Sequence, residues 1–252
     1  MDSSQIGLKH LRELALRAAH TGLAHYTRFL DPAVAEEARV AAGRCGVRCA
    51  LYGGYPDAEE VMAAFYDGDA PEPSDYPMAA LCISWNPKFA HPEHRDLLGA
   101  AMGLGLERDA LGDIAMGERD GRPCAWLFAT RDMAPYIESS LDRAGRAAVR
   151  AQRTDEPPQI SPPEGAALRV TVQNERLDAI LAAGCRLSRA EAQRLIAAGL
   201  VKLNHVPNTR ADARVGEGDL ISARGCGRLR MQAFTGESRR GRHIVTLFRY
   251  GK

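Results

Sequence analysis

The sequence predicts an α+β protein built in three parts, and three observations support this prediction. Apolar residues recur at helical spacing through residues 6–43, strand-like and helical segments alternate through residues 47–153, and a proline-rich stretch follows. We expect the 252 residues to divide into a helical or mixed N-terminal region at 1–75, an α/β domain at 76–153, a linker at 154–165 and a second domain at 166–252.

Charge divides the chain at the same place. Residues 1–165 hold 17 Lys and Arg against 25 Asp and Glu, a net charge of −8, whereas residues 166–252 hold 16 against 7, a net charge of +9. Four prolines in "TDEPPQISPPEG", at 154–165, indicate a semi-rigid linker at this boundary. The asymmetry predicts a basic module that binds a polyanion, attached to an acidic body.

Composition narrows the class of protein. No apolar run approaches the roughly 18 to 20 residues of a membrane span, and the N-terminus "MDSSQIGLKHLREL" lacks the pattern of a signal peptide. We therefore expect a cytoplasmic protein with no membrane partner. The six cysteines are scattered through the chain, so we expect reduced, partly buried thiols rather than disulfides at Cys45, Cys49, Cys82, Cys124, Cys185 and Cys226.

The N-terminal elements are expected to be helical. One helix is expected through "LKHLRELALRAAHTGLAHYTRFL", residues 8–30, and a second through residues 33–43 after Asp31 and Pro32 as cap and first turn. This predicts an all-α start to the chain.

The next elements alternate between strand and helix. The expected order is a short strand at 47–52, a strand at 77–85, a helix at 94–106, a hairpin of 112–119 and 123–130 around Asp120-Gly121, a helix at 133–145 and a closing strand at 147–153. From residue 77 this order is strand, helix, strand, strand, helix, strand. It is typical of a ferredoxin-like or RNA-recognition-type (RRM) sandwich.

Residues 175–205 predict two short helices and a strand. Leu177 and Leu181 share one face of the first helix, and the second opens with Ser188 as N-cap and Glu191 three residues later, a capping box. The final stretch, "RHIVTLFRY", alternates at period two and is rich in β-branched and aromatic residues. We expect it to extend the C-terminal domain as a strand.

Motifs of catalysis or metal binding do not stand out. His91 and His94 form an H-x-x-H without further ligands, and Cys45 and Cys49 have no partner set either. The glycines of "GLGLER" lie in a helical segment rather than between a strand and a helix, which is unlike a phosphate loop. The sequence therefore predicts no catalytic residue, no metal and no cofactor.

Arginine at the start of the second C-terminal helix is unusual. Arg189 occupies the first helical position, where a cation opposes the helix dipole. A helix N-terminus that carries an arginine binds phosphate through free backbone N–H groups and the side chain. We therefore expect Arg189 to lower the stability of the helix and to bind a polyanion. Cations are dense between residues 176 and 230, and phosphate is the anion expected to neutralise eight of them: Arg176, Arg186, Arg189, Arg194, Lys202, Arg224, Arg228 and Arg230.

The segments "RLDAIL", "SRAEAQRLIAAGLVKLN" and "VGEGDLISARGCGRLRM" resemble the RNA-binding domain named after small-subunit ribosomal protein S4, an αL-type domain, over roughly residues 168–232. The resemblance implies two helices packed on a small sheet, with RNA along the second helix and the following loop. Together with the basic residues, it predicts an RNA-binding set of Arg176, Asp178, Arg186, Ser188, Arg189, Gln193, Arg194, Lys202, Asn204, Arg224, Arg228 and Arg230. One departure is His205, where the family has glycine, so a turn that needs positive φ is expected to be strained or altered.

With this C-terminal domain, "RFLDP", "YGGYPDAE" and "HRDLLGAAMGLGLERDALGDI" resemble the bacterial YlmH family of RNA-binding proteins. The resemblance implies a non-enzymatic factor with rRNA and tRNA as partners, and we expect the protein to be a monomer. It also implies binding to large ribosomal subunits that carry obstructed peptidyl-tRNA, in ribosome-associated quality control, and gene neighbourhood in the family suggested a role in cell division.

Two alternatives stay open from the sequence. One is an RNA-modifying enzyme, a pseudouridine synthase or methyltransferase, because such enzymes often carry an S4-type domain. Their catalytic domain usually follows that domain, and only about twenty residues follow it here. The other is a DNA-binding protein, which is disfavoured because no recognition helix with base-reading side chains is evident.

Overall fold

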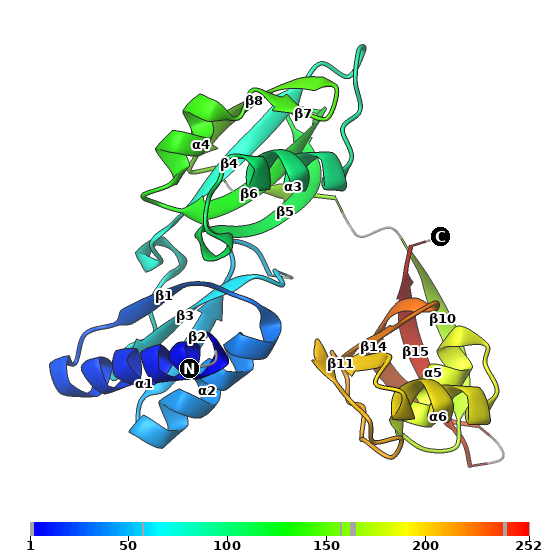
Figure 1. The fold of residues 1–252 in the computed structure, drawn as a ribbon. Helices are drawn as coiled ribbons and strands as arrows, with labels where there is room; N and C mark the ends of the chain where they lie inside the picture. Colours follow the sequence, from blue (N-terminus) through cyan, green and yellow to red (C-terminus); the bar gives the residue numbers. More distant parts are fainter. Residues whose placement is uncertain (1–2, 57, 157, 162–164, 239–240, 252) are drawn as a thin grey trace. The chain divides into compact units, whose positions relative to one another are not determined.

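A computed structural model describes residues 3–56, 58–156, 158–161, 165–238 and 241–251 (Figure 1). The chain divides into two compact units, residues 1–161 and 162–252. Residues 157 and 162–164 of the predicted linker lie outside the described residues. No helix within the described ranges is long and apolar enough to cross a membrane.

The first unit begins with two helices packed on a small sheet, here called the N-terminal layer (residues 3–66). Its helices α1 and α2 pack on one face of an antiparallel three-stranded sheet of order β1-β3-β2, around buried Leu11, Ala38 and Phe65. Asp31 caps α2 by accepting hydrogen bonds from the backbone N–H groups of Ala33 and Val34, as predicted. The elements are α1 (Ser3–Thr21), β1 (His25–Leu30), α2 (Pro32–Cys45), β2 (Arg48–Tyr52) and β3 (Val61–Tyr66).

The prediction of an all-α start at residues 6–43 is wrong for one segment. Residues 25–30 form β1 rather than the end of a helix, because α1 stops before Gly22 and the segment "HYTRFL" pairs with β3. The central strand β3 was not predicted at all. Its residues alternate between two buried clusters, with Ala63 and Phe65 in one and Met62 and Ala64 in the other, so the sequence lacks the polar alternation of a half-exposed strand.

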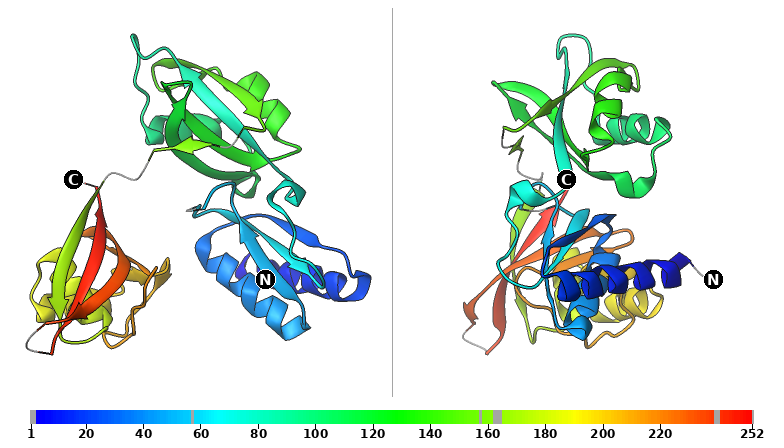
Figure 2. Two further views of the ribbon diagram at one scale, coloured as in Figure 1. Left: turned by 180° about the vertical axis from the view of Figure 1, so that it is seen from behind. Right: turned by 90° about the vertical axis from the view of Figure 1, so that its left-hand side faces the viewer.

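The rest of the first unit has the predicted RRM-type fold. Its four long strands lie in the order β8-β4-β6-β5, so the fourth is followed by the first, third and second, and α3 and α4 cover one face (Figure 2). Two short strands, β7 and β9, lie at the edges, and β9 falls inside the predicted linker. The elements are β4 (Met78–Trp85), α3 (His94–Gly103), β5 (Leu111–Arg119), β6 (Arg122–Thr130), α4 (Ala134–Ser140), β7 (Arg143–Ala144), β8 (Ala147–Thr154) and β9 (Gln159–Ile160), with 3₁₀ turns at Pro73–Asp75 and Arg108–Ala110.

The second unit packs two helices on one face of an antiparallel sheet of order β10-β15-β14-β13-β11-β12, as the S4 resemblance implies. The predicted C-terminal strand is confirmed, because β15 pairs with both β10 and β14. The elements are β10 (Gly165–Val172), α5 (Leu177–Cys185), α6 (Arg189–Ala197), β11 (Val201–Leu203), β12 (Val206–Pro207), β13 (Leu220–Ala223), β14 (Gly227–Glu237) and β15 (His243–Tyr250).

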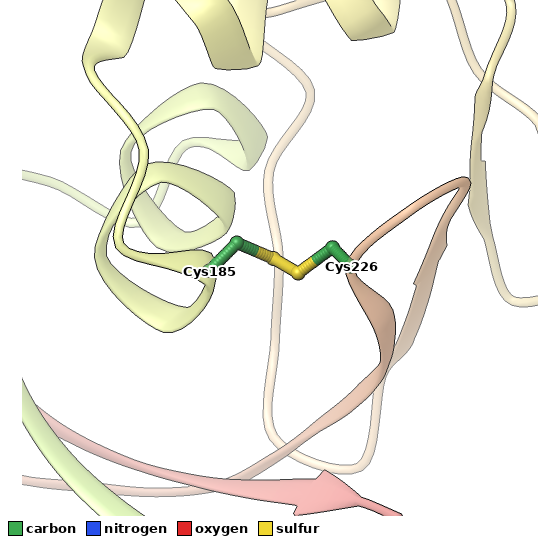
Figure 3. Close-up of a disulfide and its surroundings, with 2 residues drawn as sticks. All are labelled: Cys185 and Cys226. Carbon is green, nitrogen blue, oxygen red and sulfur yellow. A yellow bond between two sulfur atoms is a disulfide. The ribbon is translucent and has the colours of Figure 1, made fainter.

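The expectation of six reduced thiols is wrong for one pair. Cys185 and Cys226 form a disulfide with a Cα–Cα distance of 5.8 Å, which joins the end of α5 to the hairpin between β13 and β14 (Figure 3). The two residues are 41 positions apart and meet only because α5 packs on the sheet, so their spacing carried no signal. The other four cysteines are free thiols.

Candidate nucleic-acid interface

The starts of α5 and α6 bring two arginines to one buried carboxylate. Arg176 donates to Asp178 through Nε and Nη2, at 3.2 and 3.3 Å, and Arg189 donates to the same carboxylate through the same two atoms at the same distances. Gln193, one turn further along α6, donates to Asp178 Oδ2 at 2.8 Å. One carboxylate therefore holds two guanidinium groups and an amide.

The cluster combines a buried anion with accessible cations. The Asp178 side chain is 0% exposed, whereas those of Arg176 and Arg189 are 40% and 42% exposed. Burial acts to raise the pKa of Asp178, but the hydrogen bonds from Arg189, Gln193 and Arg176 outweigh it and leave the pKa below its ordinary value. With Asp178 ionised, the three charged groups sum to +1, and the excess positive charge lies on the solvent side.

This geometry gives two predicted site residues a role within the fold. Asp178 is buried, and its carboxylate holds the side chains of the two arginines. From the sequence, Arg189 was expected to lower the stability of the helix, and binding of a polyanion was the only reason expected for its position. Its ion pair with Asp178 gives a reason within the fold for an arginine at the first position of α6.

The predicted capping box is confirmed. Ser188 Oγ accepts from the Glu191 backbone N–H at 3.2 Å, and the Glu191 carboxylate accepts from the Ser188 backbone N–H at 2.8 Å. Ser188, expected among the RNA-binding residues, thus fixes the start of α6. The cap places Arg189 in the turn that faces Asp178.

The turn between β11 and β12 keeps the shape that the family's glycine would favour. Asn204 and His205 both have positive φ, 49° and 68°. Asn204 donates to Asp219 Oδ1 at 2.7 Å and accepts from the Leu220 backbone N–H at 2.9 Å. Asn204 therefore ties the turn to β13, and His205 adopts a conformation that non-glycine residues rarely adopt.

Of the remaining predicted residues, three lie on the helices and the hairpin of the second unit, and three lie on its sheet. Arg186 caps the end of α5, and Arg194 lies exposed on α6. Arg224 lies in the exposed hairpin that Cys226 anchors. Lys202, Arg228 and Arg230 lie on strands whose alternate residues are in the core with α5 and α6, so these three side chains belong to the face of the sheet away from the helices.

The first unit treats the corresponding face of its own sheet differently. Trp126 and Phe128 of β6 lie on the face away from α3 and α4, and both are buried together with Phe29, Met62 and Ala64 of the N-terminal layer. The two sheets therefore stack face to face, with apolar side chains between them.

Polar contacts reinforce this stacking. Asp113 of β5 accepts hydrogen bonds from the Tyr55 hydroxyl at 3.0 Å and from the backbone N–H groups of Glu59 and Glu60 at 2.6 and 3.2 Å. The Tyr55 ring stacks on Phe128 with centroids 5.5 Å apart. The face that aromatic residues offer to RNA in RRM domains is thus filled by the chain itself.

Within the described ranges, no group of three or more His, Cys, Asp or Glu side chains is arranged to hold a metal ion. His91 and His94 are therefore not part of such a group among those residues.

Comparisons with known proteins match this organisation. The family profile described as "Putative RNA-binding domain in YlmH" matches residues 71–156, and that of the S4 domain matches residues 175–221. A Bacillus subtilis (strain 168) protein named "Ribosome-associated protein quality control protein P2" is 35% identical over 225 residues, which cover 88% of this chain and 86% of that protein. The chain belongs to the YlmH family.

A solved structure is also similar to this YlmH-family protein. "Cell division protein ylmH from Streptococcus pneumoniae" is 22% identical with a TM-score of 0.48, over 61% of this chain and 93% of that one. The matched domains and the quality-control relative support an RNA-binding role for the YlmH-family chain.

Proposed function

We propose that this YlmH-family protein is a non-enzymatic, monomeric cytoplasmic factor that binds rRNA and tRNA on the large ribosomal subunit. Its role is in ribosome-associated quality control of stalled peptidyl-tRNA, which the name of its 35% identical relative supports. The observation that carries the RNA contact is the cluster of Arg176 and Arg189 around buried Asp178.

The cluster suits a phosphate backbone for a physical reason. A guanidinium group that is held on one side by a carboxylate loses little further side-chain entropy when it binds an anion on its exposed side. Two such groups, with the N-terminus of α6 beside Arg189, present fixed donors to neighbouring phosphates. The net charge of +9 in residues 166–252 strengthens the attraction at longer range.

The test is co-sedimentation of the full chain with large ribosomal subunits over a range of salt concentrations. We expect Arg189→Gln to weaken binding roughly tenfold, because one charge-assisted contact is lost, and to reduce the salt slope by about one. Arg95→Gln is the matched control. Arg95 is 80% exposed and pairs with Glu93 in the first unit, so its loss removes the same charge away from the cluster.

A second variant separates charge from position. Asp178→Asn keeps both arginines but replaces the carboxylate that holds them, so we expect weaker binding although the net charge of the unit rises. If Arg189→Gln and Asp178→Asn both melted normally and co-sedimented like the wild type, the cluster would not be the RNA contact.

A further inference from the structure

The face of the second unit's sheet that lies away from α5 and α6 carries aromatic rings as well as cations. On β15, Val245 and Leu247 point into the core with the helices, so Phe248 and Tyr250 alternate with them and lie on or beside the opposite face. Their ring centroids are 5.0 Å apart at an interplanar angle of 84°, an edge-to-face pair. Neither residue belongs to the apolar core of this unit, and both remain partly exposed.

Cations flank the two rings across the sheet. Arg230 of β14 is the cross-strand partner of Phe248, and Arg228 lies one alternate position further along the same strand. Ser222 of β13 pairs with both Arg228 and Lys202, so Lys202 continues this row to β11. On the other side, Arg169 of β10 pairs with Thr246.

The chemistry of this face differs from that of the Asp178 cluster. The cluster offers fixed guanidinium groups, which suit phosphates in any sequence or structure. The face offers two aromatic rings, with Lys202, Arg228 and Arg230 on one side of them and Arg169 on the other. Rings of this kind stack on bases, and a base is available for stacking only where the nucleic acid is unpaired.

We propose that this face binds an unpaired segment of RNA, with bases stacked on Tyr250 and Phe248 and the backbone along Lys202, Arg228 and Arg230. The inference rests on the proposed RNA-binding function and extends it to a class of RNA structure, a loop, bulge or single-stranded end beside a helix. The charge of the unit favours a polyanion over an apolar peptide as the occupant.

The experiment uses the full chain and two labelled RNA probes. One is a hairpin with an unpaired 3′ tail of about ten nucleotides, and the other is the same hairpin without the tail. The tail also carries 2-aminopurine, whose fluorescence falls when the base stacks. The variants are Phe248→Leu with Tyr250→Leu, which keeps apolar bulk but removes the rings, and Tyr250→Phe, which keeps the ring and removes only the hydroxyl.

We expect the double leucine variant to bind the tailed probe roughly tenfold more weakly and to lose 2-aminopurine quenching, while it binds the blunt hairpin like the wild type. Tyr250→Phe should bind both probes normally. Unchanged thermal melting of each variant shows that the fold is intact.

Failure of this inference is distinguishable from failure of the proposed function. If Arg189→Gln weakened binding to both probes while the double leucine variant bound and quenched the tail like the wild type, the cluster would stand and the stacking face would be overturned. If the wild type bound neither probe, both proposals would fall.

Discussion

The two units each carry an antiparallel sheet with helices on one face, but they use the other face in opposite ways. In the first unit Trp126 and Phe128 on that face are 1% and 2% exposed, because the N-terminal layer stacks on them. In the second unit, neither Phe248 nor Tyr250 belongs to the buried apolar cluster of the described residues. An aromatic strand thus stabilises the fold in one unit and remains accessible in the other.

This comparison indicates where RNA contact is to be sought. The face that defines RNA binding in RRM domains is occupied here by side chains from residues 25–66. The basic second unit holds the arginine cluster and the partly exposed rings. The RRM-type fold of the first unit therefore does not imply that its sheet binds RNA as in other RRM domains.

The largest expected effect contrasts the two faces directly. Phe128→Ala should lower the unfolding free energy of the first unit by about 3–5 kcal/mol, because it empties a buried aromatic site. Phe248→Ala should lower that of the second unit much less. Chemical denaturation followed by tryptophan fluorescence measures the first unit, because both tryptophans lie in it, and amide hydrogen exchange measures the second. Lost RNA binding by Phe128→Ala without lost stability would contradict the comparison.

Two glycines sharpen the same contrast. Gly54 has φ of 97°, and an added Cβ would overlap the Phe128 ring, so Gly54→Ala should destabilise the first unit by about 2–4 kcal/mol through strain and overpacking. Gly227 has φ of 90° but lies in the open hairpin, where an added Cβ has no close contact. Gly227→Ala should therefore show the backbone strain alone, about 1–2 kcal/mol. Equal losses in the two unfolding curves would indicate that Phe128 is not closely covered.

The arginine cluster provides a smaller effect on stability. Arg189→Ala should lower the unfolding free energy of the second unit by about 1–2 kcal/mol, since Asp178 loses one partner but keeps Arg176 and Gln193, and Arg189 is partly solvated. The helix dipole alone favours the opposite sign, a slight gain in stability. Hydrogen exchange of α5 and α6 amides distinguishes the two, and a gain would show that the ion pair adds nothing.

The smallest expected effect is a dependence on acid. The pKa of Asp178 is lower in the folded chain than its ordinary value near 3.8, so its contribution to stability is complete above that value and is lost as the pH falls through the lower folded pKa. The difference in unfolding free energy between the wild type and Asp178→Asn should therefore become smaller as the pH falls below about 4. Hydrogen exchange at a series of pH values measures this, and a constant difference would contradict the assignment.

Much of the fold was predictable because its signals are local. The strands and helices of the RRM-type domain follow from periodicity, and the Asp120-Gly121 turn joins β5 and β6 as expected. The capping box of Ser188 and Glu191 and the period-two pattern of β15 were likewise readable from neighbouring residues. The charge asymmetry located the basic unit.

Contacts between distant residues decided the rest. The sequence favoured a helix for residues 25–30 and gave no strand signal for β3. Pairing within a sheet that is buried on both faces overrides this local propensity. Asp178 is eleven positions from Arg189, and Cys185 is 41 from Cys226. By itself, then, the sequence determined most of the helices and strands whose signals are local, together with the basic character of the second unit. Only the tertiary structure decided which carboxylate holds the arginines and which aromatic face is filled, since packing between elements is not encoded in the spacing within them.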